Sequence, residues 1–476
     1  MSKHAKNPWL VLVLICLAQF MVILDATIVN VALPSIQKDL GLSEANLQWI
    51  VNAYTLVFGG FLLLGGRAGD LLGRKRVFLV GLVIFTSASL LNGLASSSGM
   101  LIGFRSLQGL GAALISPAAL SIISVTFEEG KERAKALGVW AAIAVGGSAF
   151  GLVLGGWLTQ TFSWPWIFFV NVPVGIAAFL LALRFVPESK DEHVHRGYDI
   201  GGAITVTGGL MMLVYAIVKA ETKGWTSGMT IGYFAVALAL LVAFIVIELR
   251  VAEPLVRMSI FRTRSLSAAN LTMFLVGSGM FAMFFFNTLY IQRVLHFGPL
   301  KAGVSFLPFT AGIMLSAGIA SSFAPRIGVR PVAAVGMLLT ALGMLLFARM
   351  PVDGSYASDV LPGMILASLG MGAVFMPLTL VATTGLEDED QGLASGLFNT
   401  SQQIGGALGL AILSTIAAGR THGGSPSQLV HGFHYAFAGA ACFVVAALIV
   451  MVAMLRKRHV AKIESVQSAE PLVVNV

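Results

Sequence analysis

Long apolar stretches recur along the whole chain and alternate with short polar segments. Most of these stretches approach the length of about 20 residues that an α-helix needs to cross the hydrocarbon core of a bilayer. The pattern therefore predicts an all-α membrane protein with fourteen spans. We expect the spans at residues 9–33, 47–65, 77–97, 100–125, 136–160, 166–186, 200–218, 229–249, 267–291, 302–323, 332–348, 359–383, 392–418 and 434–455.

The overall composition agrees with this pattern. Of the 476 residues, 57% are hydrophobic and 11% are charged, and the mean hydropathy is +0.87. A soluble core built from a chain of this length has no room for so much apolar surface. The lipid bilayer is therefore the expected surrounding of most of the molecule.

The basic residues are divided unevenly between the two sides of the membrane. A net charge of +8 and an isoelectric point of about 9.6 also occur in nucleic-acid-binding proteins. Here, however, 22 of the 30 Lys and Arg residues fall in segments on the side of the N-terminus, seven fall on the other side, and Arg105 lies within a span. Cytoplasmic loops carry such an excess. We therefore expect a multi-pass protein of the cytoplasmic membrane, with both termini in the cytoplasm and no nucleic-acid partner.

The spacing of glycines indicates an internal duplication. Three glycines of the fifth span stand 9 and 4 residues apart, and three glycines of the thirteenth span repeat these intervals. Spans seven and eight have no counterpart and are interpreted as an insert. We expect an N-terminal six-helix bundle at 1–187, a linker with helices seven and eight at 188–264, a C-terminal six-helix bundle at 265–458 and a cytoplasmic tail at 459–476.

Asp25 is the one acidic residue well inside the predicted spans. A carboxylate at such a depth costs roughly 2.5–3.5 kcal/mol on insertion scales, so it is a functional candidate. Counting about 1.5 Å per residue, Asp25 lies about 12 Å and Arg105 about 6 Å inside the outer boundary, within reach of each other. Contact with the guanidinium favours the ionised acid, and separation in a dry site favours the protonated acid. The pair is a candidate proton switch; a static ion pair, or an Arg105 that extends toward the headgroups, is the alternative.

Four segments resemble motifs of a known family. Residues 24–34 (LDATIVNVALP) and 66–75 (GRAGDLLGRK) resemble the first-helix signature and the loop between helices two and three in the fourteen-helix drug:proton antiporter branch of the major facilitator superfamily. Residues 105–111 (RSLQGLG) and 166–173 (WIFFVNVP) resemble its motifs at helices four and six. The resemblance covers nearly the whole chain. It implies a major facilitator fold of two six-helix bundles plus two inserted helices, with the substrate site between the bundles.

The resemblance also implies roles for single residues. Asp25 and Arg105 are expected to couple transport to protons, and a cytoplasmic gate is expected at Gly66, Asp70, Gly73, Arg74 and Lys75. The basic loop is also compatible with a plain positive-inside anchor.

A packing motif is expected in helix five, with one departure from the family pattern. The motif comprises Gly147, Gly151, Gly155 and Gly156, and Leu152 stands where the family usually has proline. In helix thirteen, Gln402 stands where relatives commonly have arginine. Because proline is a common cause of helix kinks, its replacement removes the kink expected at this position.

A substrate cavity is predicted from a dense surface of Met and Phe in the ninth span and from polar residues near mid-membrane. Adaptable thioether and flat aromatic side chains suit a lipophilic ligand. The candidates are Gln108, Phe281, Phe285, Asn399, Gln402 and Gln403. The polar residues are equally suited to bonding a neighbouring helix, and apolar residues to facing lipid.

Several activities lack their sequence signals. No phosphate-binding loop that ends in Gly-Lys-Ser or Gly-Lys-Thr occurs, and no Ser/His/Asp set or zinc signature falls within the spans. We therefore expect no enzyme, no metal and no cofactor, with the proton as coupling ion. The resemblance to the drug:proton antiporter branch implies proton-coupled efflux of small lipophilic drugs or antibiotics by alternating access, and we expect the protein to act as a monomer. A dedicated transporter of one metabolite or antibiotic, and a membrane receptor or structural protein without transport, are the alternatives.

Overall fold

The computed structural model of the chain describes residues 7–127, 130–189, 199–252, 254–383, 388–421 and 425–455. All regular elements in these ranges are helices, and thirteen helical segments there are long and apolar enough to cross a membrane. The predicted tail at 459–476 lies outside the described residues.

The first half of the chain contains the long helices α1, α3, α4, α5 and α6, followed by α7 and α8, which form one span together. A short helix, α2, connects α1 to α3. Their bounds are α1 Pro8–Leu40, α2 Glu44–Leu47, α3 Trp49–Leu72, α4 Arg74–Gly93, α5 Ser98–Thr126, α6 Lys131–Thr161, α7 Trp166–Phe169 and α8 Asn171–Phe185.

Two inserted helices, α9 and α10, precede the helices of the second half. Short helical turns flank several helices of the second half. The bounds are α9 Ile200–Lys223, α10 Gly228–Arg250, η1 Met258–Arg262, α11 Arg264–Leu289, η2 Tyr290–Val294, α12 Pro299–Val304, α13 Leu307–Ile327, α14 Val329–Phe347, η3 Tyr356–Val360, α15 Leu361–Thr383, α16 Asp388–Arg420 and α17 Pro426–Met454.

Helix α6 supplies the fourteenth predicted span. It is not among the thirteen apolar segments, but it is 31 residues long and packs along α1. At 1.5 Å per residue it extends about 46 Å, which exceeds the hydrocarbon thickness. The helices therefore account for all fourteen predicted spans.

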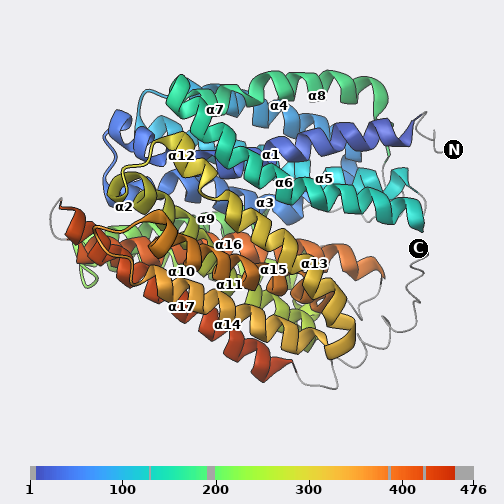
Figure 1. The fold of residues 1–476 in the computed structure, drawn as a ribbon. Coiled ribbons are helices and arrows are strands. Elements are labelled where there is room, and N and C mark those ends of the chain that lie inside the picture. Colours follow the sequence, from blue (N-terminus) through green and yellow to red (C-terminus); the bar gives the residue numbers. More distant parts are fainter. Residues whose placement is uncertain are drawn as a thin grey trace.

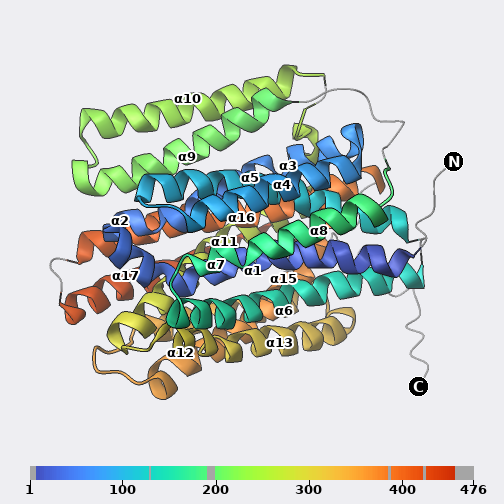
Figure 2. The same ribbon diagram turned by 90° about the horizontal axis from the view of Figure 1, so that it is seen from above.

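The two halves form two layers that face each other (Figure 1). Helices α1 to α8 make up one layer and α11 to α17 the other, and the start of α1 and the end of α17 lie at the same end of the molecule. Turned by 90°, Figure 2 places α9 and α10 along one flank. Helix α9 packs on α3 from the first half and on α16 from the second, so the insert touches both layers.

Two of the three repeated glycines make equivalent contacts in the two halves, whereas Gly138 meets nothing within 4 Å and Gly396 meets Leu63. Gly147 and Gly151 of α6 lie against α1, the first long helix of the first half, and Gly405 and Gly409 of α16 lie against α11, the first long helix of the second. A Cβ at Gly409 would lie 2.5 Å from the backbone oxygen of Ser278. Small residues allow this close approach of helices in lipid, so the duplicated spacing reflects a duplicated helix contact.

Candidate functional site

Asp25 on α1 and Arg105 on α5 form a buried ion pair. Their side chains are 0% and 1% exposed, and Arg105 Nη1 lies 2.5 Å from Asp25 Oδ2. The contact expected from the depth of the two residues is therefore present. Arg105 Nε also donates to the Ile50 carbonyl at 3.1 Å, and its guanidinium carbon lies 4.3 Å from the centre of the Tyr54 ring.

Two amide side chains complete the surroundings of the carboxylate. Gln108 Nε2 donates to Asp25 Oδ1 at 2.8 Å, and Asn171 Nδ2 donates to the same oxygen at 3.0 Å. Gln108 also accepts from Arg105 Nη1 at 2.8 Å. Because Arg105 and Gln108 are on α5 and Asn171 begins α8, two helices hold the carboxylate that α1 carries. Each buried hydrogen bond to a charged group stabilises the arrangement by about 1.5–3 kcal/mol.

A second layer of polar residues supports these amides. Asn92 Nδ2 donates to Gln108 Oε1 at 2.7 Å, and Asn171 Nδ2 lies 3.2 Å from Ser89 Oγ. Ser89 donates in turn to the carbonyl of Phe168 at 2.9 Å. The sequence motif at 166–173 contained Asn171, but no role was predicted for it or for Ser89 and Asn92. The available signal was that these three polar residues interrupt apolar spans.

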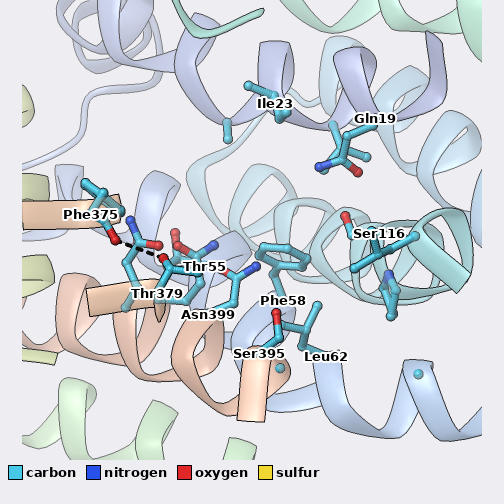
Figure 3. A pocket seen from close by; sticks show the side chains of 18 of the residues that line it. Gln19, Ile23, Thr55, Phe58, Leu62, Ser116, Phe375, Thr379, Ser395 and Asn399 are labelled. Carbon is cyan, nitrogen blue, oxygen red and sulfur yellow. Dashed lines mark hydrogen bonds between the residues drawn. The ribbon is translucent and has the colours of Figure 1, made fainter. Parts of the chain in front are cut away.

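A cavity of about 1830 Å³ lies between the two layers and is lined by residues of both. Figure 3 shows Gln19, Ile23 and Ser116 of the first half across from Ser395 and Asn399 of the second. Arg105 and Tyr54 line the cavity, whereas Asp25 is not among the lining residues. The guanidinium therefore lies between the cavity and the carboxylate.

Four of the six predicted cavity residues line it: Phe281, Asn399, Gln402 and Gln403. Gln108 and Phe285 do not, and their predicted place is corrected. Gln108 is used in the Asp25 network, and Phe285 is 2% exposed and packs on Phe286 with ring centres 5.2 Å apart. At about 100° per helical residue, Phe281 and Phe284 lie within about 100° of Met280, whereas Phe285 lies at about 140°, just beyond the face of α11 that meets the cavity.

Comparison with known proteins identifies the family. Residues 15–410 match the Major Facilitator Superfamily. The chain belongs to the major facilitator superfamily. It is 40% identical over 450 residues to the puromycin resistance protein of Streptomyces alboniger. The match covers 93% of this chain and 89% of that protein. It is 39% identical over 439 residues to the cephamycin export protein of Amycolatopsis lactamdurans, covering 91% and 90%. A peptide transporter in complex with sulfate shares the fold, with a TM-score of 0.69 and 13% identity over 96% of each chain.

As a member of this superfamily the protein is a membrane transporter, and the cavity between its halves is the candidate substrate site. The cavity extends along α3 from Val51 to Asp70. Asp70 is the last acidic residue of α3, and its side chain is 36% exposed. The cavity thus continues to the end of the molecule where α1 begins.

The opposite end of this transporter is closed by contacts between the halves. Gly156 of α6 packs on the backbone of Pro299 and Leu300, and Gly303 of α12 packs on the backbone of Leu152. Gln160 Oε1 accepts from the Leu300 amide at 3.2 Å. In the residues that the structure describes, the cavity therefore opens toward the end where α1 begins, and the halves are in contact at the opposite end.

The predicted helix-five motif divides between two partners. Gly147, Gly151 and Gly155 lie against α1, whereas Gly156 lies against α12 of the other half. Leu152, which replaces the family's proline, is 1% exposed, and α6 continues through it from Lys131 to Thr161. The motif thus combines packing within a half with closure between halves.

The predicted gating loop joins α3 to α4 and docks on the end of α8. Arg74 Nη2 lies 3.1 Å from Asp70 Oδ1, and the Lys75 amide donates to Glu188 Oε1 at 3.2 Å. Gly73 has φ +107°, and a Cβ there would meet the Glu188 carboxylate. A Cβ at Gly66 would lie 3.5 Å from Pro117 Cβ, which is an ordinary contact. The loop is therefore tied to its own half through Glu188 in this conformation.

Proposed function

We propose that this transporter exports lipophilic antibiotics or drugs from the cytoplasm in exchange for protons. The observation that carries the proposal is the Asp25–Arg105 pair, which lies beside the cavity and is fully buried. An ionisable pair in the membrane interior is expensive and is found mainly on ion or proton pathways. The relatives named for puromycin resistance and cephamycin export support the substrate class.

The proposed cycle uses two states of Asp25. We place the open end of the cavity in the cytoplasm, because 22 of the 30 basic residues lie in segments on that side. The ion pair then corresponds to the state after proton release, in which the inward-open cavity accepts a compound. In the outward-open state Asp25 takes up a proton, which removes its charge and loosens the contact with Arg105.

The energy of one proton is sufficient for this work. A membrane potential of about 150 mV supplies roughly 3.5 kcal/mol per charge. That free energy corresponds to a concentration ratio of some 300-fold for a neutral solute. We expect the exporter to act as a monomer and to need no cofactor other than the proton.

Asp25→Asn tests the proposal because the amide keeps the size of the side chain and cannot carry the charge. Cells that express the variant should be as susceptible to the exported compounds as cells without the transporter. Inverted membrane vesicles should lose uptake driven by a pH gradient. The matched control is Asp39→Asn on the same helix, since Asp39 accepts a hydrogen bond from Trp164 Nε1 at 2.7 Å and is not among the described residues that line the cavity. Equal transport by Asp25→Asn and wild type would refute the coupling role.

A second candidate is a dedicated exporter of a single antibiotic. It is favoured by the two relatives, each of which is named for one antibiotic. A susceptibility panel of chemically unrelated compounds separates the candidates: protection against one structural class supports the dedicated exporter, and protection against several supports a multidrug exporter. A non-transporting receptor would protect against none and would carry no proton flux on addition of substrate.

A further inference from the structure

Gln292 joins the two halves through a backbone carbonyl of α1. Its Nε2 atom donates to the Val31 carbonyl at 2.8 Å, a contact across 261 positions of the sequence. The bond lies toward the end of the molecule opposite the start of α1, which we call the outer end and where Gly156 packs on Pro299. In a regular α-helix such a carbonyl is already bonded to an amide of the same helix. A second donor from the other half indicates that this stretch of α1 is special.

The stretch of α1 that carries Val31 has a weakened hydrogen-bond ladder. Pro34 lies inside the helix and has no amide, so the Asn30 carbonyl loses its helical partner and the ring presses on the preceding turn. One turn earlier, the Thr27 hydroxyl donates to the Ile23 carbonyl at 3.0 Å, and the Asn30 side chain donates to the Thr27 carbonyl at 3.2 Å. Bonds of this kind compete with the ladder and bend helices. In membranes, the backbone groups near a proline are satisfied by neighbouring helices, and here a side chain of the other half does so.

The donor is presented by a turn that is fixed to its own half. Helix α11 continues into η2, a single π-helical turn, and such turns are rare and frequent at functional sites. Tyr290 in this turn is 0% exposed, and its hydroxyl donates to the Pro351 carbonyl at 2.6 Å within the second half. Gln292, two residues further, reaches α1 of the first half. The bond to α1 therefore exists only while the two halves are together at the outer end.

We propose that Gln292 is a positioning residue of the transport cycle, whose bond holds the stretch of α1 from Asp25 to Pro34 in the form that belongs to the closed outer end. Asp25 precedes Val31 by six residues, about 9 Å along the helix. When the halves separate at the outer end, the bond breaks and the proline-containing stretch is released to bend. The movement then reaches the turn that carries Asp25. Only this last step rests on the proposed function, in which Asp25 changes its protonation.

The chain contains the same kind of bond within one half, and it serves as the matched control. Gln37 Nε2 donates to the Leu42 carbonyl at 3.0 Å, at the outer end of α1. Replacement of either glutamine by methionine keeps the length of the side chain and removes the donor. The net contribution of one hydrogen bond changes an equilibrium by about 2- to 10-fold. Only the bond between the halves should change the ratio of the two conformations.

Pulsed electron paramagnetic resonance on the full chain in lipid measures this ratio. Spin labels are attached to Ser96→Cys, before α5, and to Ala357→Cys, in η3, because both positions are exposed and belong to different halves at the outer end. The background carries alanine in place of the two free cysteines. A short distance between the labels reports a closed outer end and a long distance an open one. Neither substrate nor a pH gradient is needed, so the result does not depend on proton coupling.

Gln292→Met should raise the ratio of the long to the short population by about 2- to 10-fold. Gln292→Asn should do the same, because its amide is one methylene shorter and does not reach α1. Gln37→Met should leave the ratio unchanged. An unchanged ratio in Gln292→Met, or an equal change in Gln37→Met, would overturn the proposal.

The variant Pro34→Ala separates an action through α1 from a simple contact between the halves. Alanine restores the missing amide of the helix, so the stretch around Val31 no longer needs a bond from outside. In this background Gln292→Met should change the ratio of the two populations by less than twofold. A change as large as in the parent would show that Gln292 acts only as a contact and would overturn its role in positioning α1.

Discussion

Adding a single methyl group at Gly156 should shift the transporter away from the conformation described. A Cβ at this position would lie 2.7 Å from Leu300 Cα and would overlap the Pro299 carbonyl, whereas ordinary contacts begin at 3.4 Å. These are backbone atoms, so no rotamer change relieves the overlap. Helices α6 and α12 must separate by at least roughly 0.7 Å in Gly156→Ala, and such overpacking costs typically about 1–3 kcal/mol.

The penalty applies only while the outer end is closed, because Gly156 and α12 belong to different halves. A difference of about 1–3 kcal/mol changes the ratio of two conformations by about 5- to 150-fold. The outward-open state should gain by that factor.

Labelling at the cavity residue Asn399, replaced by cysteine in a background without Cys16 and Cys442, measures the shift. In Gly156→Ala the rate should fall for a reagent applied to the cytoplasmic side and rise for one applied outside. The control is Gly146→Ala on the same helix, where a Cβ meets nothing within 4 Å. Identical rates in the two variants would refute the closure assigned to Gly156.

Three further predictions follow from other contacts. Arg105→Ala should lower the free energy of unfolding by about 3–5 kcal/mol, because it leaves a buried carboxylate unpaired. In thermal denaturation, the double variant with Asp25→Asn should recover part of this loss, and an additive loss would contradict the pairing. Gly73→Ala should destabilise the loop by about 1–2 kcal/mol, since φ is +107° and the Glu188 carboxylate occupies the place of the added methyl group. Proteolysis between α3 and α4 should become faster, and an unchanged cleavage rate would contradict this destabilisation. Phe281→Ala should change the order of preference among exported compounds while proton-driven uptake persists, as measured in inverted vesicles; an unchanged order would remove this residue from the substrate site.

The sequence was most informative where a single residue contradicts its surroundings. Asp25 and Arg105 are costly in an apolar span, and counting helical rise from the span ends placed them within reach of each other. The structure pairs them. The residues that complete the network are uncharged amides. Because burying an amide costs less than burying a charge, the sequence marks these residues less clearly as functional candidates. Asn171 meets Asp25 only because α8 crosses α1, a contact between residues 146 positions apart.

Helix ends and helix faces were predicted less well. The first span was expected to end at residue 33, but α1 continues through Pro34 to Leu40 and ends at Gly41, where φ is +63°. Hydropathy marks the hydrocarbon boundary and not the end of the helix. Phe281 and Phe285 lie four residues apart and were expected on one surface, yet the cavity meets only one of them. The rotation of α11 depends on its packing against α16 and α17, which the spacing within α11 does not specify.

The position of Arg105 between the cavity and Asp25 has a consequence for the range of substrates that the cavity can accept. Whatever molecule occupies the chamber meets the guanidinium and the Tyr54 ring before it meets the acid. The substrate and the proton therefore need not compete for the carboxylate oxygens of Asp25. Under the proposed mechanism, the surface that faces the substrate can change in shape while the acid behind it keeps the same bonds, so one proton-coupling unit is able to serve chemically different substrates.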